Sequence, residues 1–137
     1  MQFHLIHTEV PSLSLKKISD TPLVNTENLP QTYTLKISVF ADKDNQKIFG
    51  VLFSLSLEHH QEFILEVEYL AWFENNKDLT DEDLNSSFAY INAPAIAFPY
   101  LRSFISLVTL NSGFRPAILP TTNFVKMYED SKKRVKV

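Results

Sequence analysis

The first half of the chain alternates apolar and polar residues, which predicts β-strands. The segments Tyr33–Ala41, Ile48–Glu58 and Phe63–Phe73 each place apolar side chains on one face and polar or charged side chains on the other. Short polar turns, Asp42–Gln46 and His59–Gln61, separate these segments. Turns of this length join neighbouring antiparallel strands, so the three segments are expected to form a meander.

The N-terminal segment is predicted as a further strand with an irregularity. Apolar residues recur in Phe3–Val10 and Leu13–Ile18, and Pro11 lies between them. Proline cannot donate to a strand ladder, so this strand is expected at an edge of the sheet or at a bulge. The connection that follows, Asp20–Gln31, is long and shows no period, and its apolar residues either pin it to the sheet or form one wall of a groove. Those apolar residues are Leu23, Val24 and Leu29.

The second half of the chain has helical spacing. A long helix is expected to begin at the N-cap Asn92 and to end at Gly113, with Pro99 bending it or shifting its start. Its apolar residues occur nearly all round, which is typical of a helix buried on both sides. One side can lie on the sheet, and a second copy of the chain is the simplest cover for the other. The side assigned to this oligomer contact comprises Ile96, Tyr100, Phe104 and Leu107.

Two shorter helices flank the long one. Thr80 followed by acidic residues predicts an N-cap for a weak helix that runs to Tyr90. An extended segment, Pro116–Pro120, precedes a last helix capped by Thr122 or Asn123. The strands followed by helices indicate an α+β fold, and the 137 residues suit a single domain over residues 1–137.

Composition and charge narrow the function classes. The chain has eleven Phe and five Tyr, so aromatic side chains either fill an ordinary core or also line grooves and subunit contacts. Cysteine is absent, which excludes disulfides and thiolate metal sites and fits a reducing cytoplasm. No secretory leader and no apolar segment of about 20 residues is recognised, so membrane insertion is not expected.

The acidic residues dominate the body of the chain. The formal net charge is −3, but residues 1–130 hold 9 of the basic and all 16 of the acidic residues, a net charge of −7. An acidic body argues against nucleic-acid binding and favours basic partners, including positively charged unfolded chains. The last residues, 131–137, form a short basic tail that is expected to be solvated.

No residue pattern predicts catalysis. His4 and His7 would point to opposite faces of a strand, and His59 with His60 is expected as a solvated turn pair rather than a metal site. Gly50 and Gly113 are the only glycines, so no phosphate-binding loop is present. The chain is therefore predicted to be non-enzymatic, with no metal and no cofactor.

One block of sequence resembles a known family. Residues 92–124 read NAPAIAFPYLRSFISLVTLNSGFRPAILPTTNF, with Pro94, the motif Phe98–Arg102, the helix-ending Gly113 and the pair Asn123-Phe124 in order. This pattern resembles the SecB protein-export chaperones, and the upstream strands agree with that family in order and length. The resemblance implies a four-stranded antiparallel sheet with a long helix and a C-terminal helix packed on one face.

The resemblance also implies a function. Family members are cytoplasmic holdases that assemble as a homotetramer, a dimer of dimers with the long helices packed between dimers. They hold unfolded or precursor proteins in an apolar groove between the crossover loop, the sheet and the last helix. Carried over, this polypeptide-binding groove would be lined by Leu23, Val24, Leu29, Leu65, Tyr69, Trp72, Phe73, Phe124, Met127 and Tyr128.

Export members also use acids on the outer sheet face to recruit the translocation motor ATPase. Glu66 matches one of these acids, but the corresponding first-strand region, residues 12–16, has none, and the tail is basic rather than acidic. The resemblance therefore supports motor docking less than client binding. Two alternatives are a specialised SecB-like chaperone of a toxin–antitoxin system and a small-ligand module that uses the same aromatic side chains.

Overall fold

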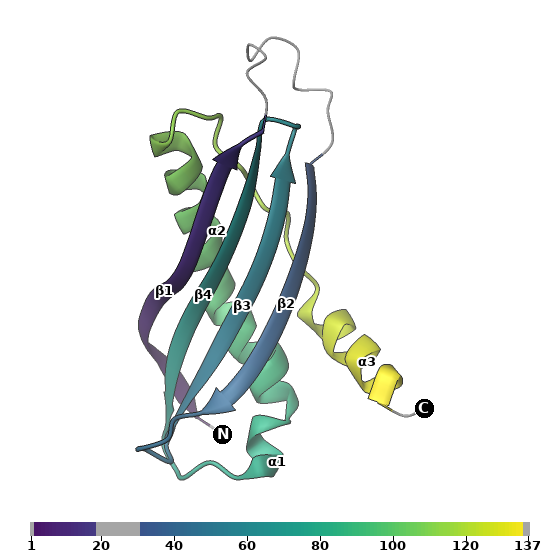
Figure 1. Cartoon of the computed structure of the whole chain (residues 1–137). Coiled ribbons are helices and arrows are strands. Elements are labelled where there is room, and N and C mark those ends of the chain that lie inside the picture. Colours follow the sequence, from purple (N-terminus) through teal and green to yellow (C-terminus); the bar gives the residue numbers. More distant parts are fainter. Residues whose placement is uncertain (1, 19–30, 136–137) are drawn as a thin grey trace.

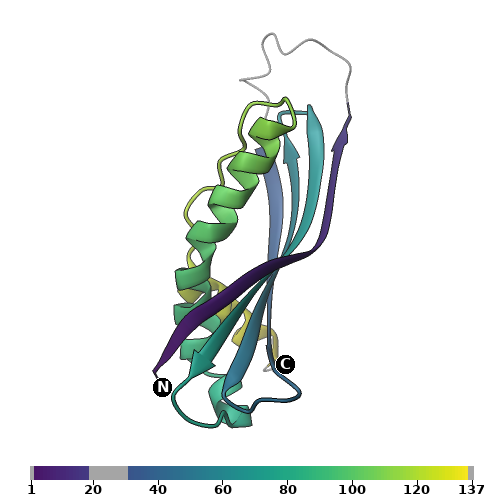
Figure 2. The same cartoon turned by 90° about the vertical axis from the view of Figure 1, so that its left-hand side faces the viewer.

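The computed structural model describes residues 2–18 and 31–135, with side chains described up to Lys132. Four antiparallel strands form one sheet in the order β1-β4-β3-β2, as Figure 1 shows. The helices lie on one side of this sheet, as Figure 2 shows. The predicted α+β fold, with a long helix and a C-terminal helix on one face, is confirmed. The elements are β1 (Phe3–Lys17), β2 (Gln31–Ala41), β3 (Ile48–His59), β4 (Phe63–Asn75), α1 (Asp81–Leu84), η2 (Phe88–Asn92), α2 (Ala93–Asn111) and α3 (Phe124–Val135).

The core lies between the inner face of the sheet and the helices. Because β3 and β4 alternate, every second side chain of these strands points to this face. Burial of their aromatic and aliphatic groups is the main contribution to the stability of the fold. Phe49 and Phe73 stack with ring centroids 5.3 Å apart, and Phe3 of β1 meets both rings edge-on. The inner face therefore carries the hydrophobic alternation that the sequence predicts.

β1 is an edge strand, as the proline in it indicates. Its pairing with β4 shifts register between Leu5 and His7 and again between Glu9 and Ser12, so Pro11 lies at the second shift. A bulge accommodates a residue that cannot donate to the ladder. The strand continues through both shifts to Lys17, which joins the two predicted segments into one.

The long helix α2 packs one side on the sheet. Its buried residues recur at helical spacing, among them Ala97, Leu101 and Ile105, each 0% exposed. The helix continues through Pro99, and Gly113 just beyond its end has φ +92°, which only glycine adopts without strain. The predicted end of the helix at this glycine is confirmed.

The predicted weak helix after Thr80 is shorter than expected. Thr80 and Asp83 form the two hydrogen bonds of a capping box, but α1 ends at Leu84 and buries no residue. A π-helical turn, η2, follows and leads directly into α2. Without a buried side, the acidic α1 lacks the packing that would extend it to Tyr90.

The helical stretch over residues 81–111 is long and apolar enough, by length and composition, to cross a membrane, with 39% of its most apolar window buried. The expectation that no apolar segment is long enough to cross a membrane is therefore wrong in terms of length and composition. A core helix of a soluble protein passes the same test, and α2 packs Leu101 and Ile105 against the sheet. The predicted connection at residues 20–31 falls outside the described residues except for Gln31, which opens β2.

Candidate functional site: surfaces on both sides of the sheet

A groove lies between the edge strand β2 and the C-terminal helix α3. It encloses about 500 Å³. Asn123 caps α3, because its Oδ1 accepts a hydrogen bond from the Lys126 backbone N–H over 3.0 Å. Phe124 anchors the start of the helix in the core against the rings of Phe53 and Phe98. The residues that line this α3 groove are Leu35, Lys36, Ile37, Ser38, Tyr90, Met127, Tyr128, Asp130 and Ser131.

Aromatic contacts hold α3 against η2 and so fix one wall of the groove. The Tyr90 and Tyr128 rings stack with centroids 5.7 Å apart, and the Tyr128 hydroxyl donates to the Asn85 carbonyl over 2.9 Å. The Lys132 ammonium lies 4.5 Å from the centre of the Tyr128 ring, a cation–π contact on the solvent side. The mixture of Met127 with tyrosine rings offers a large contact area with little directional demand.

The edge strand β2 forms the other wall of the α3 groove. The four β2 residues that line it are consecutive, Leu35 to Ser38, so the strand itself runs along the groove. Within the described residues, β2 pairs only with β3 and its other edge faces the groove. An extended segment placed there could bond to the strand as well as to side chains.

The structure brings only some of the predicted groove residues together. Met127 and Tyr128 line the α3 groove, and Phe124 lies beneath it at 6% exposure. Three predicted strand residues are core residues because α2 covers the inner face, and they expose 6% or less: Leu65, Tyr69 and Phe73. Trp72 lies on the opposite face, since its side chain alternates with those of its neighbours in β4. The loop residues Leu23, Val24 and Leu29 lie outside the described residues.

A second apolar surface covers the side of α2 that faces away from the sheet. Ile96, Tyr100 and Leu107 are 44%, 54% and 60% exposed, while Phe104 is half-buried and its ring lies 5.7 Å from that of Tyr69. Leu110 and Ile118, which the sequence pattern did not assign to this surface, are 53% and 65% exposed. Ile118 lies between the buried residues Ala117 and Leu119. The predicted extended conformation of Pro116–Pro120 implies this alternation, because successive side chains of an extended segment point in opposite directions. We call the five exposed residues Ile96, Tyr100, Leu107, Leu110 and Ile118 the α2 surface.

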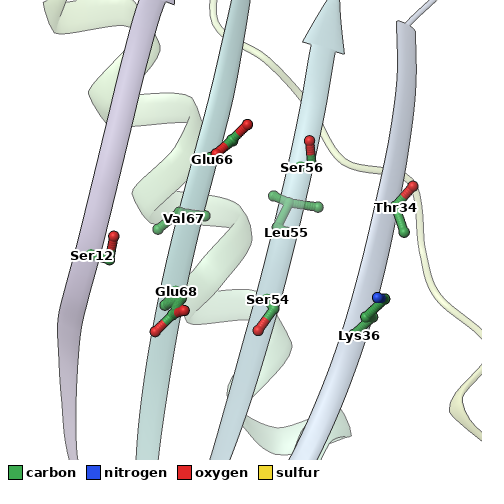
Figure 3. Close-up of a pocket in the computed structure, with 9 residues that line it drawn as sticks. All are labelled: Ser12, Thr34, Lys36, Ser54, Leu55, Ser56, Glu66, Val67 and Glu68. Atoms are coloured by element: carbon green, nitrogen blue, oxygen red, sulfur yellow. The ribbon is translucent and has the colours of Figure 1, made fainter.

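The outer face of the sheet holds a polar trough of about 450 Å³. Glu66 and Glu68 project there from β4, opposite Ser56 and Ser54 of β3, and Figure 3 shows these side chains along neighbouring strands. Figure 2 shows that no described helix covers this face. We call this surface the outer trough; its lining comprises Ser12, Thr34, Lys36, Ser54, Leu55, Ser56, Glu66, Val67 and Glu68.

A buried polar junction joins the ends of several segments at the β3–β4 turn. His59 is 4% exposed rather than solvated, and its Nδ1 lies 2.6 Å from the Gln31 side-chain oxygen. Gln31 in turn donates to the Ile118 carbonyl over 3.1 Å, and Arg115 bonds to the buried Glu62 over 3.2 Å. Burial is the main cause that lowers the pKa of His59 from 6.5 to about 4, followed by the charge of the neighbouring His60. The junction therefore links Gln31, the first residue of β2, to the connection between α2 and α3.

Metal ligation finds no support in the part of the chain that the structure describes, since no three His, Asp or Glu side chains converge there.

Comparison with known proteins agrees with this architecture. The family model described as preprotein translocase subunit SecB matches residues 1–135. The chain is 29% identical over 135 residues to a protein-export protein SecB from Ehrlichia ruminantium (strain Gardel), covering 94% of this chain and 71% of the relative. It is 31% identical over 134 residues to a protein-export protein SecB from Wolbachia sp. subsp. Drosophila simulans (strain wRi), covering 96% and 74%.

Two solved structures share the fold. A SecB-like chaperone from Mycobacterium tuberculosis, solved in complex with a ChAD peptide from an antitoxin, superposes with a TM-score of 0.68 at 18% identity over 88% of each chain. A protein of unknown function from Streptococcus agalactiae superposes with a TM-score of 0.51 at 12% identity, over 88% of this chain and 98% of that one. Both likenesses concern the fold.

The full-length match to the family model agrees with the resemblance that residues 92–124 carry, and the sheet, the long α2 and the C-terminal α3 have the order expected from it. The predictions of a non-enzymatic, cytoplasmic chaperone are confirmed through the family. The chain belongs to the SecB family of protein-export chaperones.

Proposed function

We propose that the chain holds unfolded or precursor polypeptides as extended segments in the α3 groove. The observation that carries the proposal is the combination of two walls. One is the outer edge of β2, which pairs with no other strand among residues 2–18 and 31–135, and the other is formed by the side chains of Tyr90, Met127 and Tyr128. An edge strand offers backbone donors and acceptors that any sequence can use, and flexible or aromatic side chains accept many apolar partners. Both properties suit promiscuous holding of clients.

The α3 groove can be tested by paired substitutions on one helix. Met127 is half-buried in the groove, whereas Val125 of the same helix is 48% exposed and does not line it. We expect Met127→Ala to weaken binding of a labelled, permanently unfolded polypeptide about five- to tenfold without ATP, by loss of partly buried apolar area. Val125→Ala serves as the control. Equal affinity of Met127→Ala and the parent chain would remove the groove assignment.

The α2 surface supports assembly as a homo-oligomer. Its apolar side chains form a stripe along α2 that continues onto the connection at Ile118. A stripe of this kind on a monomer marks a contact surface. A dimer of dimers needs two different interfaces, and β1, the other edge strand of the sheet, is the second candidate.

Motor docking is proposed for the outer trough. The sequence resemblance matches Glu66 to one of the family's motor-recruiting acids, and Glu68 adds a second acid on the same face, opposite Ser12 of β1. The two carboxylates favour a basic segment of a translocation motor. Glu66→Gln should weaken binding of the motor and leave binding of unfolded polypeptides unchanged, which separates this proposal from that of the α3 groove.

Two other occupants of the α3 groove are distinguishable. A dedicated antitoxin segment, which the Mycobacterium tuberculosis SecB-like chaperone was solved with, would bind far more tightly than a generic precursor peptide. A small apolar ligand would copurify and appear in native mass spectra of the intact chain. Equal binding of several unrelated unfolded peptides, with no copurified ligand, is the outcome expected for a general holdase.

A further inference from the structure

The α3 groove contains the only sulfur atom among residues 2–18 and 31–135. The chain has no cysteine and two methionines, and one of them, Met1, lies outside the described residues. The other, Met127, belongs to α3, which lies beside the β2 edge in Figure 1, and it lines the α3 groove. A side chain that can be oxidised reversibly therefore lies on the surface proposed to hold clients.

The side chain of Met127 is anchored in the fold and still borders open space. It packs against the hydrophobic core, yet the residue is only half-buried, and the groove beside it encloses about 500 Å³. A small, uncharged oxidant such as hydrogen peroxide fits a space of this size. We therefore expect peroxide to reach the thioether while the chain stays folded.

The position of α3 does not depend on the sulfur. Phe124 fixes the start of the helix in the core at 6% exposure. Further along, the Tyr128 ring stacks on that of Tyr90, and its hydroxyl donates to the Asn85 carbonyl over 2.9 Å. These contacts do not involve Met127. An oxygen added to the sulfur therefore changes the lining of the α3 groove while the helix keeps its place.

We infer that Met127 is an oxidation site that controls client binding. Peroxide converts its thioether to a sulfoxide, the sulfoxide lowers the affinity of the α3 groove for apolar segments, and a methionine sulfoxide reductase restores it. This inference rests on the proposed function of the α3 groove. It adds a reversible modification to that site, without a further binding surface.

The chemistry balances with peroxide as the oxidant. A lone pair of the Met127 sulfur attacks one peroxide oxygen, the O–O bond breaks and an S–O bond forms. The sulfur loses two electrons, and the peroxide is reduced to one molecule of water, which takes up the remaining proton. The reverse step takes two electrons from a thiol reductant, which becomes a disulfide, and the oxygen leaves as water.

The sulfoxide oxygen acts mainly on the bound state. In the free chain, this oxygen faces water in the half-open groove. A client that covers Met127 with an apolar side chain removes that water and supplies no donor in its place. Burial of a polar group without a partner is unfavourable, so we expect client binding to weaken about tenfold.

Direct oxidation of the full chain tests the site. The protein is treated with hydrogen peroxide, the excess is removed with catalase, and mass spectrometry of proteolytic peptides verifies that Met127 has gained one oxygen. The probe is a fluorescently labelled protein kept unfolded by reduction and carboxymethylation of its disulfides. We expect its affinity to fall about tenfold and to recover after treatment with both epimer-specific reductases and a thiol.

Two variants separate Met127 from every other oxidisable side chain. Met127→Leu keeps Met1, Trp72 and all Tyr and His residues, so peroxide should leave its affinity at the value measured before treatment. Met127→Gln places a polar group of similar length at the same position and should bind several-fold more weakly than Met127→Leu. Bound probe should also slow oxidation of Met127 in the parent chain, because it covers the sulfur.

Three results would overturn the inference: affinity of the oxidised parent within about twofold of the untreated chain, an equal loss in treated Met127→Leu, or equal binding by Met127→Leu and Met127→Gln. If Met127→Ala weakens binding and the sulfoxide does not, the α3 groove stands and the oxidation site fails. If Met127→Ala binds like the parent, the groove assignment fails and the oxidation site with it. Circular dichroism of the oxidised chain verifies that its helices are intact.

Discussion

The α2 surface makes a quantitative prediction through Leu107. This side chain is 60% exposed in the single chain and lies in the middle of the exposed stripe. Complete burial of a leucine contributes about 1.5–3 kcal/mol, so covering the exposed part contributes about 1–2 kcal/mol. Removal of most of that side chain by Leu107→Ala should therefore cost about 1 kcal/mol for each copy in an interface.

Symmetry doubles this effect. When two copies meet through the same surface, the substituted residue occurs twice, and the loss of about 2 kcal/mol weakens association about 30-fold. The single chain should lose little stability, because alanine is the best helix former and the position is exposed. The expected result is a lower mass at a given concentration with an unchanged unfolding transition.

Sedimentation equilibrium over a range of concentrations measures the association constant directly. Val125→Ala on α3 is the control, since Val125 is also exposed, at 48%, but lies outside the α2 surface. An association constant of Leu107→Ala equal to that of the parent would refute the assignment of α2 to the interface. So would an equal loss in the Val125 control.

The polar junction carries the remaining predictions. Arg115→Met removes one partner of the Glu62 carboxylate, whose side chain is 6% exposed. We expect the free energy of unfolding to fall by about 1–3 kcal/mol, a range reduced because the arginine is 34% exposed. Urea unfolding of the variant checks this, and an unchanged midpoint would show that the pair contributes nothing. His59 binds its proton less readily when folded, with a pKa of about 4 against 6.5, so the unfolded chain takes up more protons between these values. Its contribution to stability is complete above about pH 6.5 and is lost as the pH falls towards 4. Unfolding titrations of the parent and His59→Gln should show a flatter pH dependence for the variant in this window, and parallel curves would contradict the buried, neutral assignment.

The sequence by itself determined the elements of the fold. Alternation along three segments specifies strands because successive side chains point to opposite faces, and Pro11 specifies an edge because it lacks a donor. Gly113 marks the end of the long helix because only glycine adopts its positive φ readily. The motif at residues 92–124 also carries the resemblance to the family. It contains the long apolar helix, the glycine that ends it and the pair Asn123-Phe124 that opens α3.

Tertiary structure decided which surface each side chain serves. Leu65, Tyr69 and Phe73 are apolar and were expected to line the groove, yet they are buried beneath α2. The sequence of one strand does not reveal which other element covers its side chains. His59 was expected as a solvated turn residue, but Gln31 arrives from a distant part of the chain and makes its burial favourable. Arg115 likewise reaches the buried Glu62 from a distant part of the chain. Phe40, Gly50, Trp72 and Glu9 are brought together only by the register of the four strands. Local patterns report the conformation of a segment, whereas contacts between segments far apart in the sequence depend on how the whole sheet and its helices pack.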